Sequence, residues 1–214
     1  MRVQLPMRRL VLFAAMLALA MIVFMPVRLV LGGADGLFSA REASGTVWWG
    51  RLQEARAGPA ALGDLEARLA FLPLLTGSVQ IDVERDSAAP DRFAGSLVIG
   101  RNRRSAESVT GIVPVEGAFG ALPIAAIELT DVTVRFRDGT CEEAEGLVRA
   151  SLTAQPGLPA SLSGPARCDR GALLLPLTTG AGADGIALRL FGDGRWSAEV
   201  RVPNTPVGTI GGRL

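Results

Sequence analysis

The sequence of 214 residues contains no histidine and no tyrosine. Histidine is the commonest general base near neutral pH and the commonest protein ligand of metal ions. Its absence excludes Ser–His–Asp and Cys–His catalytic groups within this chain. No pair of carboxylates stands out as a general acid and base. A carboxylate-dependent hydrolase is therefore the weakest alternative, and we expect a protein that is not an enzyme and holds no metal or cofactor.

An excess of charge of either sign is also missing, because the formal net charge is +1. A surface that binds nucleic acid needs a basic excess, so nucleic acid is not an expected partner. The 26 glycines and 13 prolines are spread along the chain rather than clustered. Such frequent punctuation is typical of short strands joined by many turns.

One long apolar run stands near the N-terminus, where the 18 residues from Leu10 to Val27 include no charged side chain. A helix of that length spans about 27 Å, close to the ~30 Å hydrocarbon core of a bilayer. Arginines precede the run at positions 2, 8 and 9, and positive charge stays on the cytoplasmic side. We therefore predict a cytoplasmic N-terminus over 1–9, a transmembrane signal anchor over 10–31 and a periplasmic domain over 36–214, in a single-pass protein of the inner membrane.

A cleaved signal peptide is the alternative, because Ala18-Leu19-Ala20 resembles a cleavage site. The apolar run continues beyond this site through Phe24, whereas a cleavage site normally ends such a run. The sequence leaves open whether the anchor is cleaved. Both readings export the rest of the chain.

The two cysteines, Cys141 and Cys168, are the only ones in the sequence. Two cysteines without histidine provide too few ligands for a zinc site, and their spacing is far from that of a redox C-x-x-C pair. An oxidising compartment favours joining them. We predict a structural disulfide, which closes a loop of about 28 residues and stabilises the fold by roughly 3.5 kcal/mol.

Alternation of apolar and polar residues with a period of two recurs after the anchor and predicts strands. It is clear at 64–69, 79–84, 132–137, 186–190 and 196–201. Between the last two segments, Asp193-Gly194 predicts the positive φ angles of a tight hairpin turn. Glycines and a proline interrupt the one arguable helix, Ala55–Leu69. The expected fold class is all-β, an antiparallel meander of about ten strands curled or sandwiched on one apolar face.

Three local motifs could each form a binding site, but we favour an ordinary structural role for each of them. Gly180–Gly185 matches G-x-G-x-x-G, but the alternation after it predicts a strand, whereas phosphate binding needs a helix there. The arginines at 101, 103 and 104 could bind an anionic lipid or an acidic partner, yet they fit a solvated hairpin. The glutamates at 142, 143 and 145 lack the spacing of a calcium loop and fit a surface face.

Trp48 and Trp49 are adjacent, so on a strand their side chains point to opposite faces. We expect one of them in the core. The other would lie under a loop or remain exposed as a contact with a partner or with the membrane.

Several stretches carry a resemblance to a known family. Ala43–Leu52 (ASGTVWWGRL) resembles the xGTVWxGxL stretch of the type II secretion system protein N family. In the same order follow Leu62–Leu65, Leu72–Gly77, the widely spaced cysteines with Gly171–Leu175, and Asp193–Trp196. The resemblance covers most of the chain after the anchor.

The resemblance implies a non-enzymatic inner-membrane component of the machinery that exports folded proteins across the outer membrane of the Gram-negative envelope. It implies other inner-membrane platform subunits of the type II secretion system as partners, and it brings no family active site with it. The alternative is an envelope protein that binds or transfers lipid in an apolar β groove.

Overall fold

The structure is a computed structural model of the whole chain. It describes residues 7–24, 38–57, 60–85, 92–120, 122–154, 159–180, 185–201 and 208–213.

The N-terminal apolar segment forms α1 (Met7–Val23), a helix of 17 residues. It starts before the predicted Leu10 because arginine favours the helix almost as well as leucine does, so Arg8 and Arg9 join it. None of the helices in the described part of the chain combines the length and apolar character that crossing a bilayer requires. The predicted anchor over 10–31 extends past α1, and its residues 25–31 lie outside the described ranges.

After α1 the described chain is almost entirely β, and the predicted antiparallel β meander is confirmed. Fifteen strands form one sheet, in which successive strands pair antiparallel as a meander. The strands are β1 (Phe38–Ser39), β2 (Glu42–Thr46), β3 (Trp49–Ala57), β4 (Ala60–Ala70), β5 (Val79–Glu84), β6 (Ala94–Ile99), β7 (Arg103–Pro114), β8 (Ile124–Arg137), β9 (Thr140–Leu152), β10 (Ser161–Pro165), β11 (Arg167–Asp169), β12 (Ala172–Thr178), β13 (Gly185–Leu190), β14 (Arg195–Arg201) and β15 (Gly208–Arg213).

The number of strands exceeds the predicted ten partly because, at two places in the meander, two short strands pair with the same neighbouring strand. β1 and β2 both pair with β3, and β10 and β11 both pair with β12. Between β4 and β5 the chain makes a single helical turn, α3 (Phe71–Leu75), which the sequence pattern did not predict. The segment 55–69 is β3 and β4 rather than a helix, as expected.

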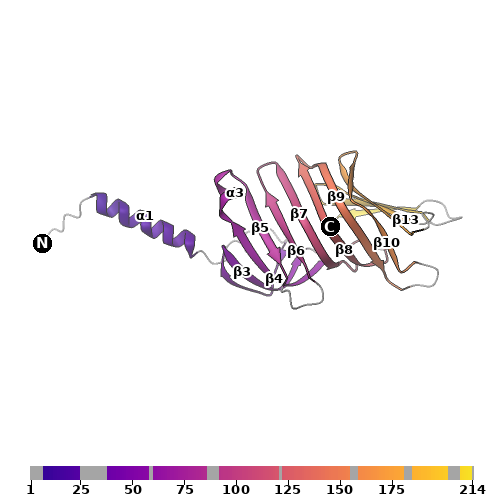
Figure 1. Cartoon of the computed structure of the whole chain (residues 1–214), viewed down its shortest axis with the longest axis horizontal. Helices are drawn as coiled ribbons and strands as arrows, with labels where there is room; N and C mark the ends of the chain where they lie inside the picture. Colours follow the sequence, from indigo (N-terminus) through magenta and orange to yellow (C-terminus); the bar gives the residue numbers. More distant parts are fainter. Residues whose placement is uncertain are drawn as a thin grey trace.

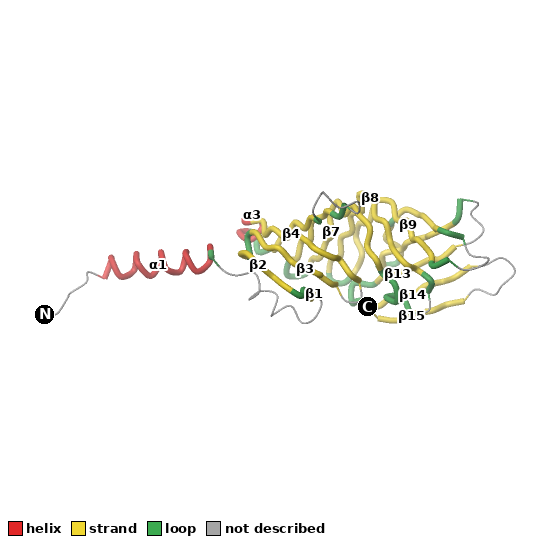
Figure 2. The backbone as a smooth tube through the Cα atoms, turned by 90° about the horizontal axis from the view of Figure 1, so that it is seen from below, coloured by secondary structure: helices red, strands yellow, loops and turns green. Residues whose placement is uncertain are grey.

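The sheet curls back on itself. Figure 1 shows β3 to β10 crossing the molecule, with β13 beyond β10. Seen from below in Figure 2, β1, β14 and β15 lie on the opposite side of the molecule from β4, β7 and β8.

The main core fills the space between β7–β9 and β12–β14. Its most deeply buried large side chains are Ile124, Val148, Leu177 and Leu188. A smaller apolar cluster of Ala55, Leu62 and Leu65 lies between β3 and β4. Side chains therefore occupy the inside of the curl at its C-terminal half, which leaves the lipid-groove alternative without support there.

Bulges at non-glycine residues bend the long strands. Glu54, Ser108 and Asp131 have φ angles near +50° and lie at register shifts in β3, β7 and β8. Each N–H freed by the bulge donates to a side-chain oxygen of a neighbouring strand: Asp64 Oδ1 on β4 at 2.9 Å, Thr133 Oγ1 on β8 at 3.1 Å and Thr110 Oγ1 on β7 at 3.0 Å, respectively. Bulges increase strand twist and bending, which is what a closed curl requires.

The predicted hairpin between β13 and β14 is present, but its turn differs from the prediction. Only Gly194 has a positive φ, +83°, whereas Asp193 does not. The loop covers 191–194 and is longer than a two-residue turn, so one left-handed residue suffices. Asp193 instead caps the turn, because its Oδ1 accepts the N–H of Arg195 at 3.1 Å.

Candidate interaction surfaces

The tryptophan pair lies where β2 turns into β3. Trp48 is in the turn and Trp49 is the first residue of β3. The turn needs Gly45, because a Cβ there would come 2.4 Å from the Trp49 carbonyl oxygen. The expectation that one tryptophan lies in the core is wrong, because a turn position removes the strand alternation on which it rested. Trp48 is half-buried and Trp49 is 61% exposed.

Both indole rings contact residues at or just after the C-terminal end of β4. The Trp48 ring lies 6.0 Å from the ring of Phe71, at an interplanar angle of 51°. The Arg68 guanidinium carbon lies 4.5 Å from the centroid of the Trp49 ring, within the range of a cation–π contact. The tryptophans and α3 therefore form one surface.

We name Trp48, Trp49, Phe71, Leu72 and Leu75 the α3 patch. No residue of α3 is buried, and Phe71, Leu72 and Leu75 are 58%, 75% and 71% exposed. The sequence carries a signal for this surface, because Leu69–Ile81 contains no charged residue.

The polar face of the sheet presents a depression of about 330 Å³ over β4–β7. It is lined by Glu66, Arg68, Asp82, Val83, Glu84, Ala94, Gly95, Ser96, Glu107 and Ser108. Glu66 accepts a hydrogen bond from Arg51 at 2.7 Å, and this bond lowers the pKa of the Glu66 carboxyl group. Glu107 lies 3.3 Å from Arg135 Nε, and Ser96 donates to Asp82 at 2.7 Å.

Glu66 is not suited to be the acid of a hydrolytic site. A glycosidase-type mechanism needs one carboxyl group that stays protonated near neutral pH, whereas the hydrogen bond from Arg51 lowers the pKa of Glu66. In the described part of the chain, no three acidic or cysteine side chains cluster as a metal site would need. The arginine–carboxylate pairs therefore act as a solvated face of the sheet.

The other local motifs lie in the strands and turns expected if they have ordinary structural roles. The strand β13 starts at Gly185, the last residue of the glycine-rich segment, so the predicted strand is present. Residues 181–184 of that segment lie outside the described ranges. Arg101 is in the β6–β7 turn, and Arg103 and Arg104 begin β7. Glu142 and Glu143 on β9 pair with Arg137 and Arg135 on β8.

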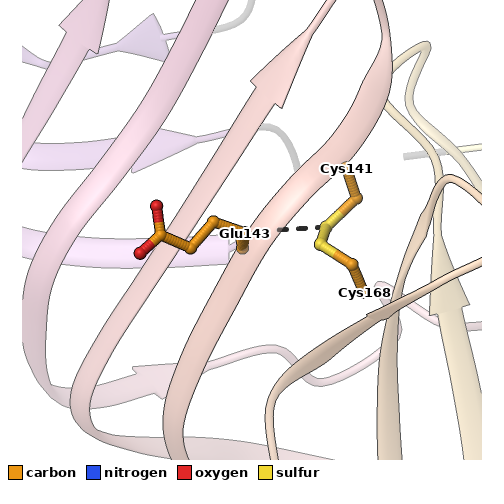
Figure 3. The surroundings of a disulfide bond; sticks show 3 residues. All are labelled: Cys141, Glu143 and Cys168. Carbon is orange, nitrogen blue, oxygen red and sulfur yellow. Dashed lines mark hydrogen bonds between the residues drawn. A yellow bond between two sulfur atoms is a disulfide. The ribbon is translucent and has the colours of Figure 1, made fainter.

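The predicted disulfide between Cys141 and Cys168 is confirmed (Figure 3). It joins the start of β9 to β11, with the Cα atoms 5.6 Å apart. The Cys141 N–H also donates to the Gly171 carbonyl at 2.8 Å, so the start of β9 is linked both to β11 and to the turn that follows it. The Cys141 sulfur lies 3.9 Å from the Glu143 carbonyl oxygen. A disulfide sulfur carries no proton, so this is a contact and not a donated hydrogen bond.

The family model described as Type II secretion system, protein N matches residues 37–205, which include every strand from β1 to β14. The chain belongs to the protein N family of the type II secretion system. Proteins of this family are structural components of secretion and not enzymes, and they belong to the bacterial envelope. No curated protein and no solved structure matches the chain.

The family assignment confirms the resemblance drawn from Ala43–Leu52. In the structure this stretch covers most of β2, the tryptophan turn and the start of β3. The stretch in which we first noted the resemblance therefore builds part of the α3 patch. Membership in protein N assigns the chain a role in type II secretion, but it names no partner and no binding residue.

Proposed function

We propose that this chain is an accessory, non-enzymatic component of the type II secretion system that is anchored in the inner membrane and acts in the periplasm. Its β domain contributes to the export of folded proteins across the outer membrane by binding other platform subunits. The protein N match over 37–205 carries this proposal, since it covers nearly the whole β domain.

The anchor is supported by the exposed apolar side chains of α1. Phe13, Met16 and Met21 are each more than three-fifths exposed, on different sides of a helix that has no polar stripe. Such a helix needs an apolar medium or a partner around it. The apolar run of the sequence continues past α1 to Val27, and Arg8 marks the cytoplasmic end.

The periplasmic location of the β domain is supported by the disulfide. Stable disulfides form in oxidising compartments, and the Cys141–Cys168 bond lies at the edge of the main core, with Cys141 buried. Reporter fusions test this topology. We expect a reporter fused after Leu214 to be active on the periplasmic side of the inner membrane. Activity confined to the cytosol would overturn the anchor, the disulfide's rationale and the secretion role together.

The mechanism would be binding at the membrane surface. An anchored domain meets neighbouring membrane subunits at a high effective concentration, so modest contacts suffice. Within the described strands, β15 is an edge of the sheet and all six of its residues are exposed. An exposed edge can accept a further strand from another protein.

Site-specific photo-cross-linking in cells tests the binding role. The basic residues of this chain are all arginine, so amine-reactive reagents would reach little beyond the N-terminus. A photoreactive residue at Thr209 on β15 or at Glu145 on the polar face is expected to trap secretion-system subunits. The same residue at the fully buried Leu177 is the matched control. Failure of both surface positions to trap any such subunit, in a strain that secretes, would refute the proposal.

A further inference from the structure

The α3 patch is exposed although the turn that carries it is well ordered. Thr76 Oγ1 and Ser78 Oγ both donate to the Pro73 carbonyl, at 2.8 Å and 3.1 Å. The Gly77 N–H donates to the Leu74 carbonyl at 3.1 Å. These bonds hold the backbone of the turn in one shape while its large apolar side chains face outward. Ordered exposure of several large apolar side chains marks a contact surface.

Alternate turns of an antiparallel meander lie at the same edge of the sheet. The edge that carries α3, at the top of Figure 1, therefore also carries the β2–β3, β6–β7 and β8–β9 turns. The Asp138 N–H donates to the Asn102 carbonyl at 2.8 Å, which shows that the last two turns are neighbours. We name this edge the α3 edge.

Charge along the α3 edge is uneven. The β8–β9 turn carries one charge of each sign, Arg137 and Asp138. The segment Leu69–Ile81 is uncharged, and the segment Ser96–Ala106 holds three arginines and no acidic residue. Val79 on β5 pairs with Ile99 on β6, and both side chains are exposed. These two residues connect the apolar α3 patch to the β6–β7 turn, where the arginines lie. An apolar tip beside a basic segment complements an anionic lipid surface.

The α3 edge lies within reach of a bilayer that α1 enters. Residues 24–37 separate α1 from β1, and a chain of that length extends at most about 50 Å. The nine residues of β3, from Trp49 to Ala57, span about 30 Å. The connecting segment can therefore extend further than the length of this strand. Tryptophan side chains prefer the water–lipid interface, and two of them flank α3.

We propose that the α3 patch inserts into the interfacial region of an anionic bilayer, so that the β domain rests on the membrane by its α3 edge. This inference rests on the proposed anchoring of the chain in the inner membrane. Because the anchor already holds the chain at lipid, a few inserted side chains are enough to fix the orientation of the domain. The opposite edge of the sheet and β15 would then face the periplasm.

Fluorescence quenching of the full chain in lipid nanodiscs tests the contact. Cys141 and Cys168 are joined, so a cysteine introduced as Leu72→Cys provides a single free thiol for an environment-sensitive dye. In phosphatidylglycerol discs, we expect blue-shifted emission and strong quenching by lipids that carry a spin label near the head group. Phosphatidylcholine discs should weaken the quenching, because they remove the attraction for the arginines.

Matched variants separate insertion from mere proximity. Leu75→Ser in the labelled Leu72→Cys chain is expected to reduce quenching several-fold. Leu147→Ser, which replaces another exposed leucine on β9, should leave it unchanged. A dye at Ser161→Cys, at the opposite edge, should remain as water-exposed as free dye.

A dye at Leu12→Cys in α1 distinguishes the two proposals, because its quenching reports the anchor alone. If the dye at 12 is quenched and the dye at 72 is not, membrane docking is wrong while the anchor stands. If the dye at 72 shifts its emission without being quenched by the lipids, a protein surface or a second copy covers the patch, and membrane docking is also wrong. If the dye at 72 is quenched and the dye at 12 is not, docking stands and the anchor fails.

Discussion

The ring of Phe119 meets the ring of Trp196 edge to face, with centroids 5.5 Å apart and planes at 87°. Phe119 lies in the β7–β8 connection and Trp196 on β14, so the contact joins two distant parts of the chain across the curl. Both side chains are about 5% exposed. Gly212 on β15 makes room for the indole, since a Cβ there would come 3.0 Å from Trp196 Nε1.

This contact predicts that Phe119→Ala lowers the free energy of unfolding by about 3–5 kcal/mol. The substitution removes the ring that packs against Trp196 and leaves a cavity in its place. Urea unfolding of the full chain, followed by tryptophan fluorescence and β-sheet circular dichroism, measures the loss. Phe71→Ala is the control: its side chain is exposed, so we expect a change of about 1 kcal/mol or less. Equal losses for the two variants would show that Phe119 does not close the core.

The bulge in β7 depends on a single hydroxyl group. Thr133 is buried, and its Oγ1 accepts the Ser108 N–H that the bulge removes from the β7–β8 ladder. Thr133→Val keeps the shape of the side chain but leaves that N–H without this acceptor. We expect a loss of about 1–2 kcal/mol in the free energy of unfolding.

Thr110→Val is the matched control, because Thr110 accepts the Asp131 N–H in the same way but is exposed to water. Its expected cost is about 0.5 kcal/mol or less. Thermal unfolding by circular dichroism compares the two variants. A larger loss for Thr110→Val than for Thr133→Val would contradict the argument that burial determines the cost.

The parts of the fold that the sequence predicted are those in which local pattern and final structure agree. The alternating segments at 79–84 and 132–137 lie in β5 and β8, and those at 186–190 and 196–201 lie in β13 and β14. The alternation is also visible in the burial of β13 and β14, where every second residue of the first four is buried. It is lost in β5, which has no buried residue, and at 132–134 in β8, where Thr133 is buried along with Val132 and Val134. The cysteine pair was equally predictable, since the chain offers no other partner for either thiol.

The bulges and the α3 patch were not predictable, because both depend on residues far away in the sequence. Nothing in Ser108 indicates a positive φ; its acceptor, Thr133, lies 25 residues further along the chain. Their sequence predicts that Trp48 and Trp49 lie on one strand, but the turn at Val47-Trp48 between β2 and β3 places both outside the core. A run such as FLPLL normally predicts burial, and only the packing of the whole sheet shows that it is left outside.

The disulfide predicts a redox-dependent stability. Replacing both Cys141 and Cys168 by alanine is expected to lower the free energy of unfolding by about 2–4 kcal/mol, mainly by restoring entropy to the unfolded chain. Reduction of the unmodified chain should produce a similar loss, and reduction of the double variant should produce none. Urea unfolding with and without reductant measures all four cases. A double variant that is as stable as the oxidised chain would refute a stabilising role.

The Arg189 guanidinium predicts how stability depends on acid. It donates to Asp169 Oδ2 and to Glu199 Oε1, both at 3.0 Å, and so ties β11 and β14 to β13. The hydrogen bond from Arg189 lowers the pKa of the Asp169 carboxyl group. The unfolded chain therefore takes up this proton before the folded chain does. The resulting stability is complete above the ordinary carboxyl pKa of about 4 and is lost as the pH falls further, through the lowered pKa.

Arg189→Gln removes this dependence, so its destabilisation relative to the unmodified chain should be largest near neutral pH and should shrink below about pH 4. Arg201→Gln is the control, because Arg201 is more exposed and lies 4.0 Å from Glu199. Its effect on stability should be small at every pH, as for most surface ion pairs. Urea unfolding across this acid range measures both variants. A destabilisation by Arg189→Gln that stays constant down to strongly acid pH would show that Arg189 acts through packing of its side chain and not through the Asp169 carboxylate.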